Sequence, residues 1–360
     1  MIAEERMIEY NMRKGKTAKK RAQVIIPSSF HQKKTMNKKS LRIVFMGTPE
    51  FAVASLKALV ENGYRVVGVI TMPDKPAGRG YRLQPSPVKR YALEAGLTVL
   101  QPEKLKAPRF LEQLKELRAD LQVVVAFRML PEVVWSMPPL GTFNLHASLL
   151  PQYRGAAPIN WAIINEEEES GVTTFFLSHE IDTGKIIFRE KSAIKPSDDA
   201  GSLHDRLMLM GADLVIKTVD AVISGTVTTI SQETLFTNEA ELKPAPKIFK
   251  EDCRIRWDQP SKKISDFIRG LSPYPAAWTT LMKENGETFK LFACEIISEA
   301  DDEGGIFSPG TIRTDGKTYL RVATADGFIA VTDIQLSGKR RMNIADFLNG
   351  YNFPKDAVFQ

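Results

Sequence analysis

Cysteine is scarce in this sequence: 360 residues include only Cys253 and Cys294, with no Cys-X-X-Cys pair and no neighbouring histidine cluster. This argues against a disulfide framework and against a structural zinc site, so we expect no metal in this protein. Such cysteine usage is typical of a reducing cytoplasm, where we expect the chain to act. Each thiol is predicted to be a small buried apolar side chain rather than a nucleophile.

Long apolar runs and a dinucleotide fingerprint are also missing. No stretch approaches 18 consecutive apolar residues, so we expect no membrane-spanning helix and no membrane partner. The first strand is followed by Gly47-Thr48-Pro49 instead of a Gly-X-Gly-X-X-Gly pattern, which disfavours a dehydrogenase. With 43% hydrophobic and 26% charged residues, the chain is of ordinary globular composition and long enough for two domains with separate cores.

The positive charge is confined to one end of the chain. The formal net charge is +6, yet residues 1–40 alone hold 11 Lys+Arg against 3 Asp+Glu, a net of +8 that leaves −2 for the remainder. Any nucleic-acid surface in the folded part must therefore be local. We interpret residues 1–40 as a disordered basic extension, with an RNA-contacting arm as the alternative. They lack the apolar segment of a secretory signal, and Met36 is a candidate translation start that the intact mass of the native protein would test.

Alternating apolar and amphipathic segments predict an α/β domain over residues 41–225. A β-rich run at 41–46 is followed by Thr48 as candidate N-cap, by Pro49 as candidate first residue of a helix, and by a strand at 65–71. This β-α-β opening predicts a Rossmann-like, mostly parallel sheet. Further strands are expected at 98–100, 121–126, 142–146, 172–177 and 185–189, and further helices at 86–95, 108–118, 155–165 and 198–224.

The remainder of the chain is predicted to form a linker and a second domain. Periodicity weakens over residues 226–252, which contain Pro244 and Pro246 in a lysine-rich stretch, and we interpret them as a linker. A helix at 261–271 and several short alternating runs separated by glycine-containing turns follow. This pattern predicts a small OB-like β-barrel over residues 253–360.

One predicted strand carries polar groups suited to carbonyl chemistry. Asn144 and His146 are two residues apart and so project from one face at the carboxyl end of the strand, where open α/β sheets bind ligands. Asp182-Thr183-Gly184 follows 36 residues after the histidine. An amide can donate to an oxyanion, an imidazole can carry a proton, and a carboxylate can orient it or move protons through water. Alone, the histidine or the Asp-Thr-Gly turn would be ordinary structure; as a set, they predict catalytic Asn144, His146 and Asp182 for acyl transfer without a metal.

Several motifs, taken in order from Leu41 over about nine-tenths of the chain, resemble those of the folate-dependent formyltransferase family. They are Met46–Phe51, Pro73–Gly80, Gln84–Lys89, Asn144–Pro151, Arg154–Ile159 and Asp182–Gly184. The loop at 73–89 and the C-terminal barrel with Gly338–Met342 are similar to the branch of that family that acts on methionyl-tRNA. The resemblance implies a cytoplasmic, monomeric transferase of translation initiation, which moves the formyl group of 10-formyltetrahydrofolate to the α-amino group of methionyl-initiator tRNA.

The same resemblance implies two groups of binding residues. Those for the folate cosubstrate are Phe127, Met129, Leu130, Ser148, Leu149, Leu150 and Pro151. Arg128 and Met129 depart from the family pattern, in which small or aliphatic residues line the pterin pocket. Those for tRNA are Lys75, Arg79, Arg82, Lys89, Arg154, Lys339, Arg340 and Arg341. Arg79 is the leading tRNA contact because a guanidinium reaches phosphates and base edges, whereas solvated loops are the alternative for both basic segments.

Two other functions compete with this interpretation. A folate-dependent formyltransferase for a sugar or nucleotide amine would share the chemistry of residues 144–184, but would need neither the loop at 73–89 nor the barrel for RNA. A non-catalytic RNA-binding protein would use the barrel and the basic extension, but has no use for Asn144, His146 and Asp182 as a set.

Overall fold

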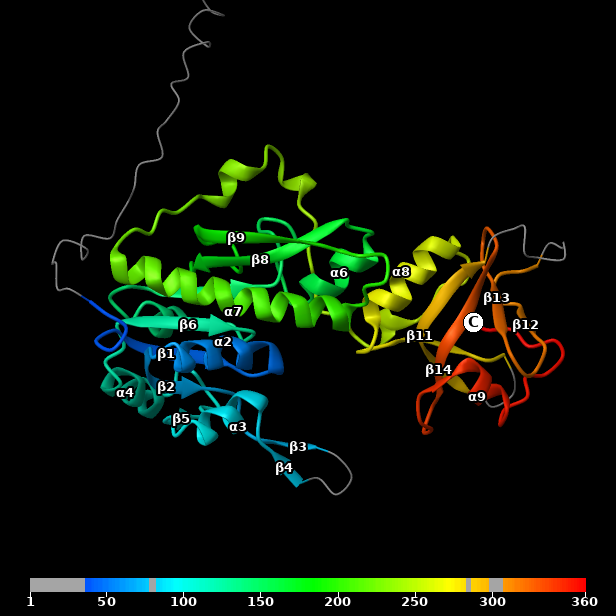
Figure 1. Cartoon of the computed structure of the whole chain (residues 1–360), viewed down its shortest axis with the longest axis horizontal. Coiled ribbons are helices and arrows are strands. Elements are labelled where there is room, and N and C mark those ends of the chain that lie inside the picture. The colour runs from blue at the N-terminus through cyan, green and yellow to red at the C-terminus, as the bar shows by residue number, and fades with distance from the viewer. Residues whose placement is uncertain (1–35, 78–81, 283–285, 298–306) are drawn as a thin grey trace, which may run out of the picture.

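The computed structural model describes residues 36–77, 82–282, 286–297 and 307–360. An α/β domain and a smaller β domain lie side by side, with helix α8 between them (Figure 1). The sheet of the first domain has the strand order β5-β2-β1-β6-β7-β8-β9. Its first five members pair in parallel, while β8 and β9 are antiparallel additions at one edge. These strands are β1 (Arg42–Gly47), β2 (Arg65–Ile70), β5 (Val99–Leu100), β6 (Leu121–Val125), β7 (Thr142–His146), β8 (Glu169–Phe176) and β9 (Ile186–Ala193).

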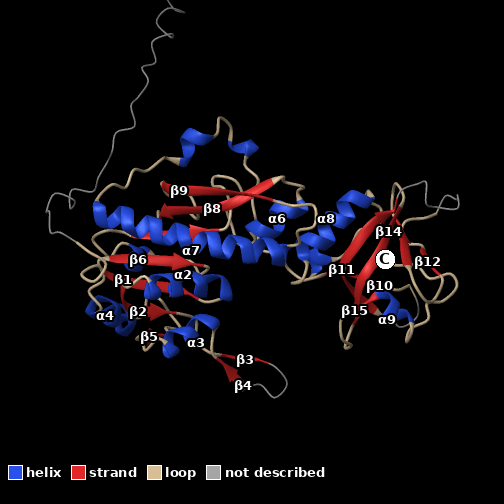
Figure 2. Ribbon diagram, viewed as in Figure 1, coloured by secondary structure: helices blue, strands red, loops and turns tan. Residues whose placement is uncertain are grey.

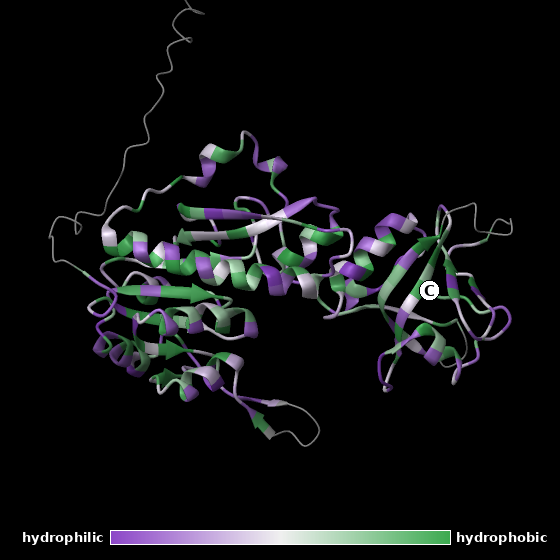
Figure 3. Cartoon of the chain, viewed as in Figure 1, coloured by the Kyte–Doolittle hydropathy of each residue, from purple (hydrophilic) through white to green (hydrophobic). Residues whose placement is uncertain are grey.

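Helices cover both faces of this sheet because alternate strand residues point to opposite sides. Ile43 and Phe45 of β1 pack in a core with helices α2, α3, α6 and α7, whereas Val44 and Met46 pack with α4 and α5. The central strands are accordingly mostly hydrophobic, while the covering helices show both hydrophobic and hydrophilic residues (Figure 3). The helices are α2 (Glu50–Glu61), α3 (Pro87–Glu94), α4 (Pro108–Glu116), α5 (Glu132–Trp135), α6 (Pro158–Ile164) and α7 (Ala200–Ser224).

The first helix begins one residue later than predicted. Pro49 is the N-cap of α2 in an extended conformation, and Thr48 provides no capping hydrogen bond. The Pro49 carbonyl accepts from the Ala52 N–H at 3.0 Å, so the backbone itself closes the first turn. Helix α7 has the side-chain signals that α2 lacks: Asp199 and Ser202 form a capping box, and Gly225 ends the helix in the left-handed region at φ 65°.

The second domain is an antiparallel sheet that closes on itself (Figure 2). Its strand order is β10-β11-β14-β13-β12, with β15 paired to β14. The last residues join the two edges: Gln360 exchanges backbone hydrogen bonds with Thr280 at 2.9 and 3.1 Å, and Val358 bridges Thr311. The predicted mostly parallel sheet with a separate antiparallel β domain is thus confirmed. The elements are α8 (Ser261–Leu271), β10 (Ala277–Thr280), β11 (Thr288–Ile297), β12 (Ile312–Thr314), β13 (Leu320–Ala323), β14 (Phe328–Leu336), β15 (Met342–Asn343) and α9 (Ile344–Leu348).

Two short segments add structure where loops were expected. The stretch 73–89 contains a small hairpin of β3 (Lys75–Ala77) and β4 (Arg82–Gln84). The segment 226–252 contains η2 (Gln232–Leu235), η3 (Glu239–Glu241) and the first residues of η4 (Glu251–Cys253). This segment packs along the loop that follows β7, since the Tyr153 N–H donates to the Lys243 carbonyl at 2.7 Å and the Ala156 N–H to the Ala245 carbonyl at 2.7 Å.

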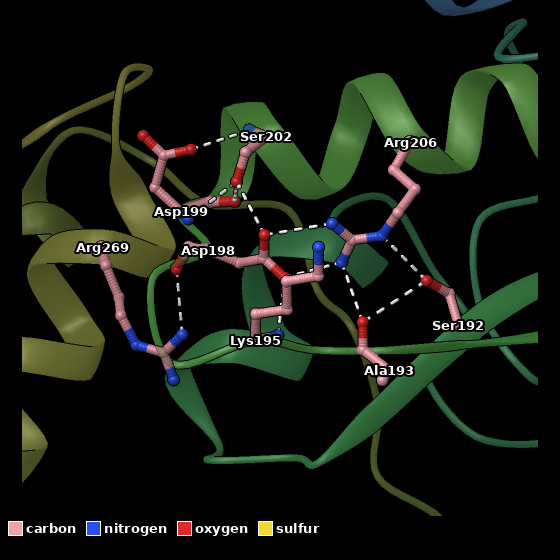
Figure 4. A network of polar contacts seen from close by, with 8 residues as sticks. All are labelled: Ser192, Ala193, Lys195, Asp198, Asp199, Ser202, Arg206 and Arg269. Carbon is pink, nitrogen blue, oxygen red and sulfur yellow. Dashed lines mark hydrogen bonds and ion pairs between the residues drawn. The ribbon is translucent and has the colours of Figure 1, made fainter.

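The two domains meet through a polar network around Asp198 (Figure 4). The buried Asp198 carboxylate accepts hydrogen bonds from Arg206 of α7. The backbone carbonyl of Asp198 accepts from the Arg269 guanidinium of α8 at 3.0 Å. Nearby, the Asn160 amide donates to the Gly270 carbonyl at 2.8 Å. Hydrogen bonds therefore fix α8 against the α/β domain.

Of the helices in the described ranges, none combines the length and hydropathy that a bilayer crossing requires.

Candidate active site

His146 lies at the carboxyl end of β7 and is buried, with 7% of its surface exposed. Its Nε2 is 2.8 Å from the Tyr153 carbonyl oxygen. A carbonyl only accepts hydrogen bonds, so in the neutral ring Nε2 carries the proton and Nδ1 has the free lone pair. Nδ1 faces Asp182, whose Oδ2 is 3.8 Å away, beyond hydrogen-bond distance. The Tyr153 carbonyl, and not the carboxylate, therefore holds the ring by a hydrogen bond.

Asp182 is oriented by the loop that follows β7. Its Oδ2 accepts from the Gly155 N–H at 3.0 Å. Gly155 has φ 129°, and a Cβ there would lie 2.3 Å from the Ala245 carbonyl oxygen, so this position requires glycine. Asp182 itself adopts φ 55°, in the left-handed region that residues other than glycine rarely occupy. One loop thus supplies both the acceptor for His146 and the donor for Asp182.

Asn144 lies two residues before His146 on β7, as the alternation predicted. Phe143 and Leu145 point into the core shared with α2 and α7, which leaves the other face to Asn144 and His146. The Asn144 side chain is partly exposed and has no hydrogen-bond partner among the described residues. Its amide is therefore free to donate to an oxygen of a bound molecule.

The predicted folate residues after β7 lie in a turn that hydrogen bonds hold in place. The Ser148 hydroxyl donates to the Gln152 carbonyl at 2.7 Å, and the Thr173 hydroxyl donates to the Ser148 carbonyl at 2.6 Å. Leu150 is fully buried against Phe175. Ser148 and Leu150 therefore build the scaffold of the turn. The folate contacts of Ser148, Leu149, Leu150 and Pro151 stay a prediction.

The other predicted folate residues follow β6. Met129 is 70% exposed, whereas Leu130 packs into the core beside α4 and Phe127 is partly buried. Arg128 donates to the carbonyls of Pro102 and Glu103, so its guanidinium ties this loop to the neighbouring segment. The departure of Arg128 from the family pattern therefore serves local structure. A contact of Met129, Phe127 or Leu130 with folate remains a prediction.

The predicted tRNA residues around the β3–β4 hairpin have different environments. Lys75 is exposed on β3. Lys89 is paired with Asp74 at 2.5 Å, and this contact holds the pKa of the Asp74 carboxyl below its usual value. Arg79 lies outside the described residues, and of Arg82 only the backbone is described. Lys89 is thus an anchor of the hairpin as well as a candidate contact.

In the basic turn of the second domain, residues 339–341, one of the three cations is paired with a carboxylate. Lys339 and Arg340 are exposed between β14 and β15. Arg341 pairs with Asp333 at 2.5 Å, and its guanidinium lies 4.3 Å from the centre of the Phe292 ring. Lys339 and Arg340 are therefore the more available cations of this turn.

Arg154 and Gln232 reveal a contact that sequence reasoning missed. The Gln232 side-chain oxygen accepts from Arg154 Nε and Nη2 at 3.0 and 2.7 Å. Gln232 was assigned to a linker, where an isolated glutamine gives no signal of burial. Arg154, predicted to contact tRNA, lies beside Gly155 and hence beside Asp182.

No group of three or more His, Cys, Asp or Glu placed for a metal ion occurs in the described ranges.

Comparisons with known proteins identify the family of both domains. The family model "Formyl transferase" matches residues 41–219, and "Formyl transferase, C-terminal domain" matches residues 247–352. A methionyl-tRNA formyltransferase from Parabacteroides distasonis is 62% identical over 317 residues, covering 88% of this chain and 97% of the relative. One from Porphyromonas gingivalis is 49% identical over 327 residues, covering 90% and 100%.

Solved structures show the same fold at lower identity. The N-formyltransferase from Helicobacter canadensis, solved with folinic acid and dTDP-3-aminofucose, matches with a TM-score of 0.58 and 21% identity over 84% of this chain and 100% of that one. HypX from Aquifex aeolicus, solved with tetrahydrofolic acid, matches with a TM-score of 0.59 and 17% identity over 89% and 51%. The two domain matches and the high identity over nearly whole relatives lead to one conclusion: this chain belongs to the methionyl-tRNA formyltransferases of the formyl transferase family.

Proposed function

We propose that the protein transfers the formyl group of 10-formyltetrahydrofolate to the α-amino group of methionyl-initiator tRNA, which yields N-formylmethionyl-tRNA for translation initiation. The observation that carries this proposal is the position of His146 and Asp182 against the loop 153–155, with Asn144 on the same face of β7 as His146, in a chain whose relatives bear this name. The carboxyl ends of β1, β6 and β7 lie at the same edge of the parallel sheet, where such folds bind ligands.

The site has features that fit a formyl-folate cosubstrate. The Asn144 amide has no partner in the described part of the chain, and Met129 presents an exposed apolar side chain on the loop after β6. Asn144 would hold the formyl oxygen, and the loop after β6 would contact the planar pterin. When bound, the folate supplies the activated formyl group and then leaves as tetrahydrofolate.

We propose one catalytic step for each of the three side chains. The methionyl α-amine has a typical pKa of about 7.7–8.0, so a useful fraction is neutral near pH 7 and attacks the formyl carbon. Asn144 donates to the oxyanion that develops, a contribution of about 3 kcal/mol for donors of this kind. His146 Nδ1 has the lone pair that can accept the proton released by the amine. Asp182, 3.8 Å away, then stabilises the imidazolium. The imidazolium returns the proton to the departing folate nitrogen as the bond between that nitrogen and the formyl carbon breaks.

The acceptor is proposed to be a tRNA because of two basic segments. The exposed Lys75 lies on the hairpin next to the α/β domain, and Lys339 and Arg340 lie on the turn of the second domain. Cations so placed can neutralise backbone phosphates. Arg79 and Arg82 are proposed to add to the first of these segments.

The test is a comparison of acceptors at equal enzyme concentration. Formyl transfer from 10-formyltetrahydrofolate is measured to charged initiator tRNA, to elongator methionyl-tRNA and to small amines, including an amino sugar nucleotide. We expect the highest kcat/KM with initiator tRNA. A preference for a small amine would overturn the proposal in favour of a sugar or nucleotide formyltransferase, and binding of tRNA without any transfer would favour an RNA-binding protein.

A further inference from the structure

We infer that Gln232 is a positioning residue for this reaction, acting through Asp182 and Arg154; its kinetic consequence rests on the proposed function. Gln232 opens η2 and is 1% exposed. Its Nε2 donates to the carbonyls of Asp182 and Gly184, each at 2.8 Å, and its Oε1 accepts twice from Arg154. A primary amide has two donors and two lone pairs, so every hydrogen-bonding position of Gln232 is used.

The turn at Asp182 needs such support because its backbone is unfavourable. Asp182 has φ 55°, a backbone conformation that a residue other than glycine keeps only where the surrounding structure enforces it. At Gly184 a Cβ would lie 1.7 Å from the Phe176 carbonyl oxygen, so the turn is pressed against the end of β8. The two carbonyls that Gln232 binds flank Thr183. Gln232 therefore fixes the segment of backbone from which the Asp182 carboxylate reaches toward His146.

The same amide also secures the opposite side of the site. Arg154 lies between Tyr153, whose carbonyl binds His146, and Gly155, whose N–H binds Asp182. By accepting from the Arg154 guanidinium, Gln232 ties this loop to the Asp182 turn. A pair of backbone hydrogen bonds between Ile230 and Ile186, both 2.9 Å, brings Gln232 to this place.

A different explanation is that Gln232 merely helps to dock the segment 226–252. Gln152 separates the two explanations because it is a second amide that docks this segment. Its Nε2 donates to the Glu241 carbonyl at 3.1 Å and its Oε1 accepts from the Lys243 N–H at 2.7 Å, without contact to Asp182. Gln152→Met is thus the matched control for Gln232→Met.

The kinetic experiment compares Gln232→Met, Gln232→Glu and Gln152→Met with the wild type in formyl transfer to methionyl-initiator tRNA. Gln232→Met should lower kcat at least tenfold, with the KM of both substrates within twofold. Gln232→Glu still accepts from Arg154 but cannot donate to the two carbonyls, so it should lose kcat as well. Gln152→Met should stay within twofold of the wild type. A wild-type kcat in Gln232→Met or Gln232→Glu, a loss confined to KM, or an equal loss in Gln152→Met would overturn the inference.

Hydrogen exchange of the free protein tests the same inference without catalysis. Gln232→Met should accelerate amide exchange in the peptide covering residues 182–186 at least tenfold, and Gln152→Met should not. Unchanged exchange in Gln232→Met, or equal acceleration in both variants, would refute the positioning role. If the wild type fails to formylate any tRNA, the proposed function fails, and the exchange result still decides the role of Gln232.

Discussion

Replacing Asp198 by Asn should destabilise the α/β domain by about 2–3 kcal/mol at neutral pH. Asp198 is 5% exposed, and its carboxylate accepts from Arg206 at 2.6 and 3.0 Å and from the Lys195 N–H at 2.6 Å. These contacts are drawn as dashed lines in Figure 4. Asparagine keeps the shape and one acceptor, but it turns an NH2 group toward partners that can only donate. The substitution therefore removes a charge and creates a clash between donors.

The magnitude follows from the exposure of the two partners. Breaking a buried ion pair costs about 3–5 kcal/mol, and a hydrogen bond to a charged group contributes about 1.5–3 kcal/mol. The Arg206 side chain is 28% exposed, so water can still solvate its guanidinium when the partner carboxylate is lost. The expected cost therefore lies near the lower end of these two ranges. For a domain of this size, 1 kcal/mol changes Tm by about 2–4 °C, so the expected decrease is about 4–12 °C.

The pH dependence of this effect has a definite sign. The hydrogen bonds from Arg206 lower the pKa of Asp198 in the folded state. A carboxyl with a depressed folded pKa stabilises the protein above its unfolded pKa of about 3.9, and this stabilisation is lost as pH falls through the folded value. The difference between the wild type and Asp198→Asn should be full at pH 7 and should shrink below about pH 4.

Urea unfolding followed by circular dichroism at pH 7, 5 and 3 measures this difference. Asp205→Asn is the control, because Asp205 lies on the same helix with a 76% exposed side chain and should change the free energy of unfolding by less than about 0.5 kcal/mol. A loss below 0.5 kcal/mol in Asp198→Asn at pH 7, or a difference that stays constant at low pH, would refute this reasoning.

Three further predictions concern other positions in the two domains. Gly184→Ala places a Cβ 1.7 Å from the Phe176 carbonyl and should lower turnover at least 100-fold, whereas Gly63→Ala, with nothing within 4 Å, should cost only about 1 kcal/mol of stability and keep normal turnover. The double change Lys339→Ala, Arg340→Ala should weaken tRNA binding and reduce the slope of log K against log salt by about 2; an unchanged slope would count against phosphate contact. Tyr153→Phe removes the hydroxyl that donates to Glu167 at 2.5 Å and should cost about 1 kcal/mol in thermal unfolding with activity retained, because the Tyr153 carbonyl still binds His146; a large loss of turnover would contradict this.

The sequence predicted elements whose residues obey a local period. The alternation of Phe143 and Leu145 with Asn144 and His146 predicted both the strand and the face that bears the polar pair, and β7 has the expected bounds. The helix at 261–271 was likewise found with its observed limits. The hairpin β3–β4 was missed because three-residue strands are too short to show a period. Thr48 was misplaced as a cap because its residue type favours that position, while the backbone of Pro49 takes it.

The parts of the site that escaped prediction depend on distant contacts. The partner of His146 is a backbone carbonyl, which every residue possesses and no residue type announces. Gln232 meets Asp182 across 50 residues, in a segment whose weak periodicity indicated only a linker. Lys89 was predicted as a tRNA contact from its charge, whereas its pairing with Asp74 is visible only in the fold. Residue types therefore indicated the candidate residues of the site, and the fold was needed to show which contacts support them.

The most direct test of the account is the rate of formyl transfer to methionyl-initiator tRNA by the wild type, Asn144→Ala and His146→Ala in a single turnover. Each variant should still fold. Asn144→Ala should retain the thermal unfolding of the wild type, since Asn144 has no partner among the described residues, whereas His146→Ala should lose about 1–3 kcal/mol because it leaves the Tyr153 carbonyl without its buried partner. Each should transfer formyl about 100-fold or more slowly, with substrate binding preserved. A near-normal rate in His146→Ala would contradict the assignment of this site as the centre of formyl transfer.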